Sequence, residues 1–407
     1  MVLKFRWETE FKETEIGEIP KEWEVKRLEE ITTVESGGSA PQGERYFING
    51  KYPFVRVKHL NNDKYIQDYD LINDEAVKDY NLRLFKKKTI VFPRSGESIN
   101  LGKYNMIPFD SYIVNHLAAV KNIENVSDID FVFYMLTLFD NFAEESVAGT
   151  TLPYLRISDI SKRKIVFPPL PEQSRIATVL SWFDDLIENK KKQNEILEKT
   201  AMAIFKNWFI DFEPFKGEEF VFNEELGKEI PRGWEVKRLG EVVKFLYGEG
   251  LPERNRKEGI YPVVGSSGII GFHSQYIAEP PTIIIGRKGN AGSIQLFLEY
   301  SFPIDTVFYS SKYTLSEVIF YIYHLLKVIS LEDMALTDTA VPGLNIHMLN
   351  SLIVFLPPPH ILQSFHSLVE PLFQKIILNQ KQIMTLRKIR DTLLPLLVFG
   401  KLRVEEI

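Results

Sequence analysis

The chain has 407 residues, with 49 Lys and Arg against 55 Asp and Glu, seven His and no Cys. This length predicts two or three domains that each bury a core of their own. The lack of cysteine excludes disulfides, thiolate zinc sites and a cysteine nucleophile, and it favours the cytoplasm as the location of the protein. A hydrophobic fraction of 44% with 26% charged residues argues against disorder, and the net charge of −6 weakly opposes nucleic-acid binding.

The N-terminal segment, MVLKFRWETEFKETE, is too charged for the apolar region of a signal peptide. Elsewhere the sequence contains no run that approaches the roughly 18 uncharged apolar residues of a membrane-spanning helix. We therefore expect no targeting peptide and no membrane association.

The two halves of the chain repeat one another. The sequence WEVKRL occurs at Trp23–Leu28 and again at Trp234–Leu239. Four further matches follow in the same order: a glycine-rich turn that ends in proline (37–41 and 248–252), an Arg-x-Gly turn (89–96 and 282–289), a Pro-x-Leu loop (153–157 and 342–346) and a proline-rich segment (165–171 and 353–359). We therefore expect two copies of one unit, although two similar domains without a functional link remain an alternative.

The first part of each copy is typical of strands and turns. Short apolar runs such as Thr89–Phe92 and Ser111–Val120 are broken by Gly, Pro and Asn. Longer apolar runs at Phe131–Phe139 and Glu317–Leu326 are compatible with helices. The fold class that we expect is α+β, with more strand than helix in these parts.

Beyond Pro171 and Pro359 the apolar residues change to a spacing of three and four, which predicts two long helices of about 40 residues, or roughly 60 Å. Occasional polar residues in the apolar seam favour a coiled coil between them, and Pro395 is expected to kink or stop the second helix. The alternative is a helix that packs only on its own domain. The expected pairing residues are Ile176, Leu180, Phe183, Ile187, Leu197 and Ile204 in the first helix and Val369, Leu372, Ile376, Ile383, Leu386 and Leu393 in the second.

The sequence contains no recognised catalytic motif. It has neither the Gly-x-x-x-x-Gly-Lys-Ser/Thr phosphate loop nor the Gly-x-Ser-x-Gly nucleophile turn, and its seven histidines lack metal-ligand spacing. The glycines of Gly286–Gly292 are read as a tight turn that presents an arginine. We therefore expect no catalytic site, no metal and no cofactor.

Basic residues concentrate in two stretches despite the negative net charge. Residues 81–104 hold six cations and one anion, residues 372–403 hold seven cations and one anion, and the acidic joint at 211–229 reads as a linker. Such stretches are often solvated surface, but together with polar loops they favour contacts to phosphates and bases. The threonines of those loops have capping of local structure as an equally good explanation.

The ordered motifs resemble those of the DNA-specificity (S) subunits of type I restriction-modification systems, along nearly the whole chain. Besides the repeated opening motif, the matching segments are GTTLPYL at Gly149–Leu155, PPLPEQ at Pro168–Gln173, WFIDFEPF at Trp208–Phe215 and FGKLRV at Phe399–Val404. The second copy departs from the pattern in two places. PPPHILQ replaces PPLPEQ, so we expect a distorted helix start there, and Thr337–Thr339 replaces the Gly-Thr-Thr triplet.

The resemblance implies two α+β target-recognition domains in a non-catalytic subunit. Each domain is followed by a long helix, and the two helices pair as an antiparallel coiled coil. Such a subunit reads a bipartite, asymmetric double-stranded DNA target and directs two methyltransferase (M) subunits, and restriction/translocase (R) subunits in the full complex, to it. The expected boundaries are 1–165 for the first recognition domain, 166–212 for the first conserved helix, 213–358 for the linker and second recognition domain, and 359–407 for the second conserved helix.

The candidate DNA-binding residues are Lys58, Arg94, Lys103, Thr150, Thr151, Tyr154 and Arg156 in the first domain and Arg287, Lys288, Asn290, Thr339 and Asn345 in the second. Two other functions stay open at this point. A stand-alone hydrolase would need acidic or histidine clusters at equivalent positions in both halves, and a coiled-coil scaffold would ignore DNA.

Overall fold

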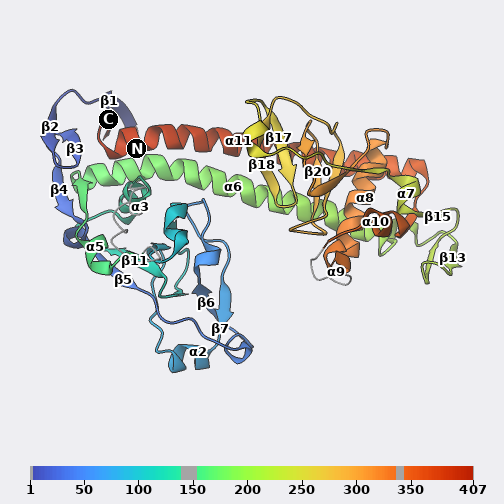
Figure 1. Ribbon diagram of the computed structural model, residues 1–407, viewed down its shortest axis with the longest axis horizontal. Helices are drawn as coiled ribbons and strands as arrows, with labels where there is room; N and C mark the ends of the chain where they lie inside the picture. The colour runs from blue at the N-terminus through green and yellow to red at the C-terminus, as the bar shows by residue number, and fades with distance from the viewer. Residues whose placement is uncertain (1–2, 139–153, 336–342, 407) are drawn as a thin grey trace. The chain divides into compact units, whose positions relative to one another are not determined.

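The computed structural model describes residues 3–138, 154–335 and 343–406. Contacts divide the chain into two compact units, Met1–Asn189 with Gln382–Ile407, and Lys190–Lys381. The division passes through both long helices, α6 (Leu170–Phe209, green in Figure 1) and α11 (Pro359–Val398, red). Each unit therefore contains one part of each helix.

The first unit is built on two small sheets. A four-stranded sheet has the order β5-β11-β8-β9 and a three-stranded sheet has the order β10-β6-β7, with β10 parallel to β6. All four residues of β8 are buried, which is why its sequence, IVFP, is wholly apolar. The strands are β5 (Thr32–Ser36), β6 (Tyr52–Val55), β7 (Asp70–Ile72), β8 (Ile90–Pro93), β9 (Asn105–Met106), β10 (Tyr112–Ile113) and β11 (Leu117–Asn122).

The second unit has the same sheets in the same order. Its four-stranded sheet runs β16-β22-β19-β20 and its three-stranded sheet runs β18-β17-β21, again with one parallel pair, β17 and β21. The repeat seen in the sequence thus extends to the topology. The strands are β16 (Phe245–Tyr247), β17 (Tyr261–Gly265), β18 (Gly268–His273), β19 (Thr282–Gly286), β20 (Ile294–Phe297), β21 (Phe302–Pro303) and β22 (Val307–Ser310).

Short elements complete both units. The remaining strands form the pairs β1 (Leu3–Trp7) with β24 (Leu402–Glu406), β2 (Phe11–Thr14) with β3 (Gly17–Pro20), β4 (Glu24–Arg27) with β12 (Lys164–Phe167), β13 (Phe220–Asn223) with β14 (Lys228–Pro231), and β15 (Glu235–Arg238) with β23 (Ile353–Leu356). The other helices are α1 (Leu28–Ile31), α2 (Asp74–Asp79), α3 (Ile129–Thr137), α5 (Ile157–Ser161), α7 (Leu239–Val242), α8 (Ser316–Ile329), α9 (Leu331–Ala335) and α10 (Ile346–Ser351), and the 3₁₀ turns are η1 (Glu44–Tyr46), η2 (Val57–His59), η3 (Glu97–Leu101), η4 (Glu213–Phe215) and η5 (Glu253–Asn255).

The long helices pair in an antiparallel manner within each unit. In the first unit Ile176 and Leu180 share a core with Leu397 near the end of α11. In the second unit the rings of Phe209 and Phe365 lie 5.1 Å apart, so the end of α6 meets the beginning of α11. The α+β fold with a long helix after each half is confirmed, and each helix has the predicted length of 40 residues.

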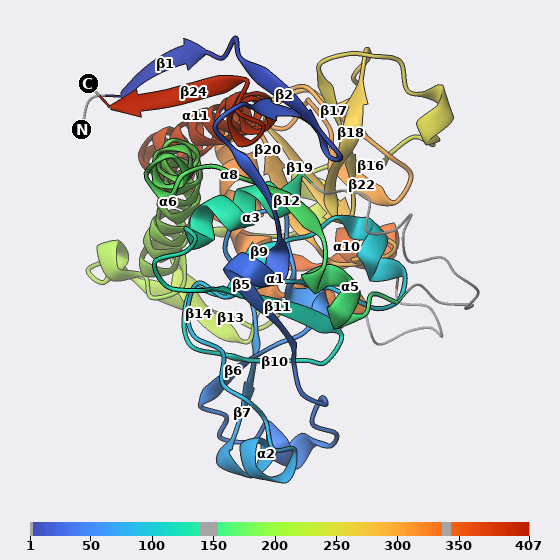
Figure 2. The same cartoon turned by 90° about the vertical axis from the view of Figure 1, so that its left-hand side faces the viewer.

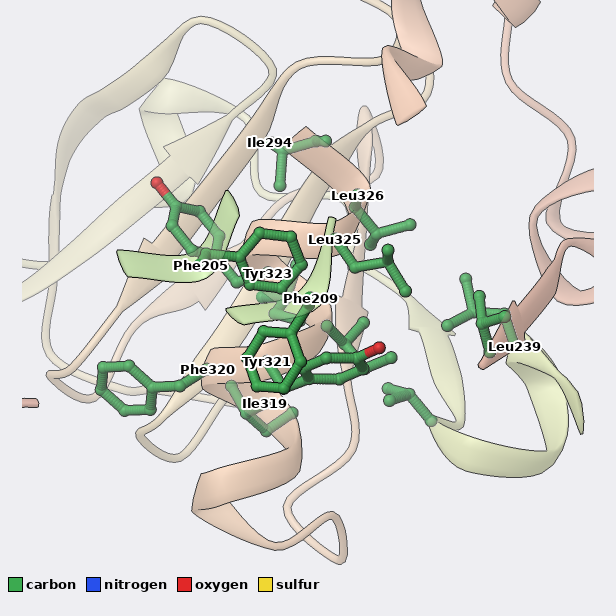
Figure 3. Packing of buried hydrophobic residues seen from close by; sticks show 14 of the residues in the cluster. Phe205, Phe209, Leu239, Ile294, Ile319, Phe320, Tyr321, Tyr323, Leu325 and Leu326 are labelled. Atoms are coloured by element: carbon green, nitrogen blue, oxygen red, sulfur yellow. The ribbon is translucent and has the colours of Figure 1, made fainter. Parts of the chain in front are cut away.

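Half of the predicted pairing residues are buried, and the other half are only partly buried. Of the pairing residues named above, the buried ones are Ile176, Leu180, Ile187, Val369, Ile376 and Ile383, and the half-buried ones are Phe183, Leu197, Ile204, Leu372, Leu386 and Leu393. Three further residues that the apolar spacing did not predict as pairing residues are almost fully buried: Phe205, Phe209 and Phe373. Figure 3 shows Phe205 and Phe209 among the side chains of α8, because the end of α6 packs on the second unit's own helix as well as on α11.

Two details of the helices bear on the sequence expectations. Pro395 was expected to kink or stop the second helix; it does not stop α11, which continues to Val398, and a kink at this proline stays a prediction. The second helix start is not distorted either. The carbonyl of Pro358 accepts hydrogen bonds from Ile361 and Leu362 at 3.0 and 3.2 Å, as the carbonyl of Pro169 does from two residues of α6 at 2.8 and 3.0 Å.

Polar residues inside the helix pair have specific partners. Asn379 is fully buried and donates to Asn194 at 2.9 Å. In the first unit Arg390 of α11 bonds Asp184 of α6 at 2.5 Å, and the hydroxyl of Tyr134 on α3 also donates to Asp184. These contacts join both helices to the domain and fix their register.

The two chain ends meet in the first unit. Strands β1 and β24 lie side by side and antiparallel (Figure 2). Arg403 of β24 bonds both carboxylate oxygens of Glu172 at 2.5 and 2.8 Å, and it also bonds Glu8. The indole of Trp23, which is fully buried, donates to Glu172 at 3.0 Å. One carboxylate thus connects the opening motif, the start of α6 and the C-terminal strand.

Glycines in the repeated turn allow a close approach of two backbones. A Cβ atom on Gly37 would lie 2.2 Å from the carbonyl oxygen of Ile113, and one on Gly248 would lie 2.0 Å from that of Ile304. Both distances are too short for any side chain. The turn motif is therefore a steric requirement of the packing between the two sheets of each half.

We predict that Gly248→Ala lowers the free energy of unfolding by about 2 kcal/mol, because the new Cβ must displace backbone. Gly250→Ala is the matched control, since its Cβ meets nothing within 4 Å. Urea denaturation of the two variants measures the difference. Equal midpoints for both would contradict the close approach.

We also predict that Asp184→Ala lowers the free energy of unfolding by about 3 kcal/mol, since it leaves Arg390 without its buried partner. Asp391 bonds the same guanidinium at 2.8 Å, but its side chain is 59% exposed. Asp391→Ala should therefore cost less than about 1 kcal/mol. Denaturant titrations of both variants test the ranking, and a reversed order would refute it.

Candidate nucleic-acid interface

The Arg-x-Gly turn is braced in the same way in both halves. The amide of Arg94, after β8, donates to the carbonyl of His116 at 2.9 Å, and the amide of Leu155 donates to the carbonyl of Arg94 at 2.8 Å. In the second half the amide of Arg287 donates to Thr306 at 2.9 Å, and that of Leu344 donates to Arg287 at 3.0 Å. Three segments that are distant in sequence thus meet at each turn.

In the first half this meeting point presents both polar and aromatic groups. Arg94 is only 7% exposed, because its guanidinium lies 4.7 Å from the centre of the Tyr154 ring, bonds the Tyr154 hydroxyl and donates to the carbonyl of Leu155 at 3.2 Å. Tyr154 is 50% exposed, and Arg156, which precedes α5, is exposed and makes no capping bond. Arg94 therefore orders the loop that presents the other two residues.

Two further polar groups lie at this turn and were not among the predicted site residues. Half-buried Ser95 and exposed His116 share a hydrogen bond of 2.5 Å between Oγ and Nδ1. Ser95 is the variable residue of the Arg-x-Gly turn, and His116 belongs to none of the repeated motifs. Only the antiparallel pairing of β8 and β11 brings them together, so no local sequence signal could have identified them.

The second half presents different side chains on the same backbone frame. Arg287 is half-buried over the ring of Tyr247 at 5.0 Å and donates to the carbonyl of Asp305 at 3.1 Å. Lys288 and Asn290 are exposed on the turn. Asn345 caps α10, because its side chain accepts from the amide of His347 at 2.8 Å, whereas Arg156 at the matching position is free of such a bond.

The other candidates lie apart from these turns or outside the described residues. Lys58 is exposed and pairs with Asp70 at 2.9 Å, and Lys103 donates to the carbonyl of Leu60 at 3.3 Å. Thr150, Thr151 and Thr339 fall outside the described ranges.

The basic stretches are largely engaged in ion pairs with distant acids. Arg83 pairs with Glu35 at 2.6 Å, and Lys88 pairs with Asp130 at 2.8 Å, a hydrogen bond that raises the pKa of Lys88. In α11, Arg387 pairs with Asp63 at 2.8 Å. Much of the local positive charge is therefore structural, and the exposed cations on the turns are better placed for phosphate contacts.

Lys64 is the centre of a polar cluster between the first domain and α6. It is 3% exposed and bonds Asp130 at 2.6 Å and Ser181 at 2.8 Å. The adjoining cavity has a volume of about 310 Å³ and is lined by both of these partners as well as Asp185. Because its buried lysine is fully bonded, this cluster orients the domain on the helix.

Within residues 3–138, 154–335 and 343–406, no group of three or more His, Asp or Glu side chains could hold a metal ion. Over the same ranges, no helix combines the length and apolar character needed to cross a membrane.

Comparison with known proteins identifies the family. The family described as "Type I restriction modification DNA specificity domain" matches residues 20–199 and 231–388. The chain is 40% identical over 443 residues to the type I restriction enzyme MjaIX specificity subunit of Methanocaldococcus jannaschii, covering 100% of this chain and 99% of that protein. It is 22% identical over 452 residues to the HindI specificity subunit of Haemophilus influenzae, covering 88% of this chain and 96% of that protein.

The fold agrees with a solved structure of the same kind. The crystal structure of the type I restriction-modification S subunit from M. genitalium matches with a TM-score of 0.57 at 22% identity, covering 92% of this chain and 96% of that one. The family match and the relative that is 40% identical, rather than the fold alone, decide against the alternatives of a hydrolase and of a scaffold without DNA specificity. The chain belongs to the DNA specificity subunits of type I restriction-modification systems, the non-catalytic components of these complexes.

Proposed function

We propose that this subunit reads a bipartite, asymmetric duplex target, with residues 1–165 as the first target-recognition domain and residues 213–358 as the linker and the second. The long helices, within 166–212 and 359–407, then set the separation of the half-sites. The observation that carries the proposal is the pair of identically braced Arg-x-Gly turns with different exposed side chains. Two unlike half-sites require the same backbone arrangement in both domains but different side chains that contact the bases.

The chemistry of the exposed groups supports direct contact with DNA. Arginine can donate two hydrogen bonds to guanine, and an asparagine amide can pair with adenine. Arg156 and Asn290 offer these groups, while Lys288 offers charge for a phosphate. The remaining candidates, including Lys58, Lys103 and the three threonines, stay in the proposal as secondary contacts.

The partners that we propose are two methyltransferase subunits and, in the restricting complex, restriction/translocase subunits. Large apolar side chains remain exposed along both helices, which supports a protein-covered surface. These are Trp182, Leu186 and Ile196 on α6 and Leu368, Leu378, Met384 and Ile389 on α11. With cellular DNA as its target, the complex acts in the cytoplasm.

Long-read methylation mapping tests the function as a whole. A host that carries this system as its sole methyltransferase should modify adenines in one asymmetric, two-part sequence. Replacing residues 20–165 with the matching domain of a relative should change one half of that sequence and leave the other half and the spacing unchanged. A methylome without a two-part motif, or a swap that alters both halves, would overturn the assignment.

We predict that Arg156→Ala weakens specific binding of the complex with its methyltransferase by about tenfold, the effect of losing one good contact to a base or phosphate. The thermal midpoint should stay unchanged, because this exposed side chain makes no capping bond. Lys12→Ala removes an equally exposed charge from β2 and serves as the control. Equal affinities for the two variants would remove Arg156 from the interface.

A further inference from the structure

The β17–β18 hairpin exposes apolar side chains at the edge of a sheet. Ile269 is 55% exposed, Ile270 is 37% exposed and Phe272 is 42% exposed. The register shifts between Val263 and Val264, so Ile269 faces Val264 and Ile270 has no partner across the strands. An edge strand with such residues invites aggregation unless something covers it.

The hairpin is continuous with the candidate DNA-binding turn of the second half. The hydroxyl of Ser293 donates to the carbonyl of Ser266 at 2.8 Å, and the amide group of Gln295 donates to the carbonyl of Gly265 at 3.2 Å. These bonds hold the tip of the hairpin against the turn that carries Lys288 and Asn290. A ligand bound at the turn therefore extends naturally onto β18.

The segment that precedes the hairpin carries Arg254, Arg256 and Lys257 and is hydrogen-bonded to the outer strand, β18. The guanidinium of Arg256 donates to the carbonyl of Ile270 at 2.8 Å, and the amide of Lys257 donates to Nδ1 of His273 at 2.9 Å. Lys257 and Arg254 are exposed, and Glu253 and Glu258 flank them. Exposed cations beside an apolar ribbon suit a polyanion that also presents apolar groups.

The first half lacks this apolar ribbon. A long connection that contains η2 joins β6 to β7, in place of the tight turn at Ser266 and Ser267. Its edge strand carries Asp70, which pairs with Arg56 at 2.8 Å and Lys58 at 2.9 Å. The two halves thus differ in chemistry at equivalent strands, as two readers of different sequences should.

We propose that the β17–β18 hairpin enters the major groove and that Ile269, Ile270 and Phe272 recognise thymine methyl groups there, an inference that rests on the proposed function. A two-stranded ribbon fits the major groove, and the 5-methyl group of thymine is the apolar feature of the bases in that groove. The second recognition domain therefore reads a half-site in which A·T pairs are specified through the thymine methyl group.

Uracil substitution tests this directly. The target found by methylation mapping is prepared as duplexes in which each thymine, on either strand, is replaced singly by uracil. Binding by the complex of this subunit with its methyltransferase should weaken about fourfold at one or more positions, the effect of one lost methyl burial. The sensitive positions should fall only in the half-site assigned to the second domain by domain replacement.

The variants Ile269→Ser and Ile270→Ser, which keep no methyl group, should bind the thymine and uracil duplexes equally at a sensitive position. Ile48→Ser makes the same change at an isoleucine of the first half that is 60% exposed, and it should keep the discrimination. If a hairpin variant fails to fold, the uracil series on the unaltered protein still decides.

Three outcomes separate the possible failures. If uracil substitution leaves the affinity unchanged throughout that half-site while the target is still selected, the proposed role of the hairpin is overturned and the proposed function stays intact. Loss of assembly with the methyltransferase in the absence of DNA, in either hairpin variant, identifies the ribbon as a protein contact and also overturns the reading. Binding without any sequence preference in the unaltered complex refutes the proposed function itself.

Discussion

The antiparallel pairing of α6 and α11 is the constraint on which both units depend. Each helix buries residues in both cores: Ile176 of α6 and Leu397 of α11 lie in the core of the first unit, and Phe209 of α6 and Phe365 of α11 lie in that of the second. The C-terminal helix therefore belongs to both cores. Burial of roughly 1.5–3 kcal/mol per large side chain makes this sharing the main reason why the halves fold as one chain.

The first turns of α6 and α11 differ in chemistry, although they occupy equivalent positions in the two copies. Glu172 at the start of α6 bonds both Trp23 and Arg403, whereas buried Ile361 and Leu362 stand at the start of α11. Within the described part of the chain, the indole nitrogen of Trp234 consequently has no hydrogen-bond partner, and Phe212 and Phe215 surround its ring at 5.5 and 5.3 Å. In the first unit the hydrogen bonds of Glu172 connect the N-terminal motif to the C-terminal strand β24. In the second unit apolar packing around Trp234 holds the linker residues Phe212 and Phe215.

The sequence predicted the periodic and the repeated parts of this structure well. The helices, the α+β class and the duplicated turn around Gly37 and Gly248 follow from local pattern, because each depends on neighbouring residues. Burial of Arg94 and the contact between Ser95 and His116 could not be predicted, since they depend on strand pairing. The ion pairs of the basic stretches could not be predicted for the same reason, because their acidic partners are distant in the sequence. Asp63 and Arg387, for example, are 324 positions apart.

The bracing of the recognition turns explains how the halves can diverge without losing their fold. The bonds that join each turn to its neighbours run between backbone amides and carbonyls, so they place no demand on the side chains that the turn presents. Tyr154 and Arg156 in one half can therefore correspond to Gly343 and Asn345 in the other. The residues that the packing requires, such as the glycines of the close approach and the buried tryptophans, are not among those that the turns present to solvent. The side chains that a turn presents are thus free to change wherever the bonds that hold the turn are made by backbone.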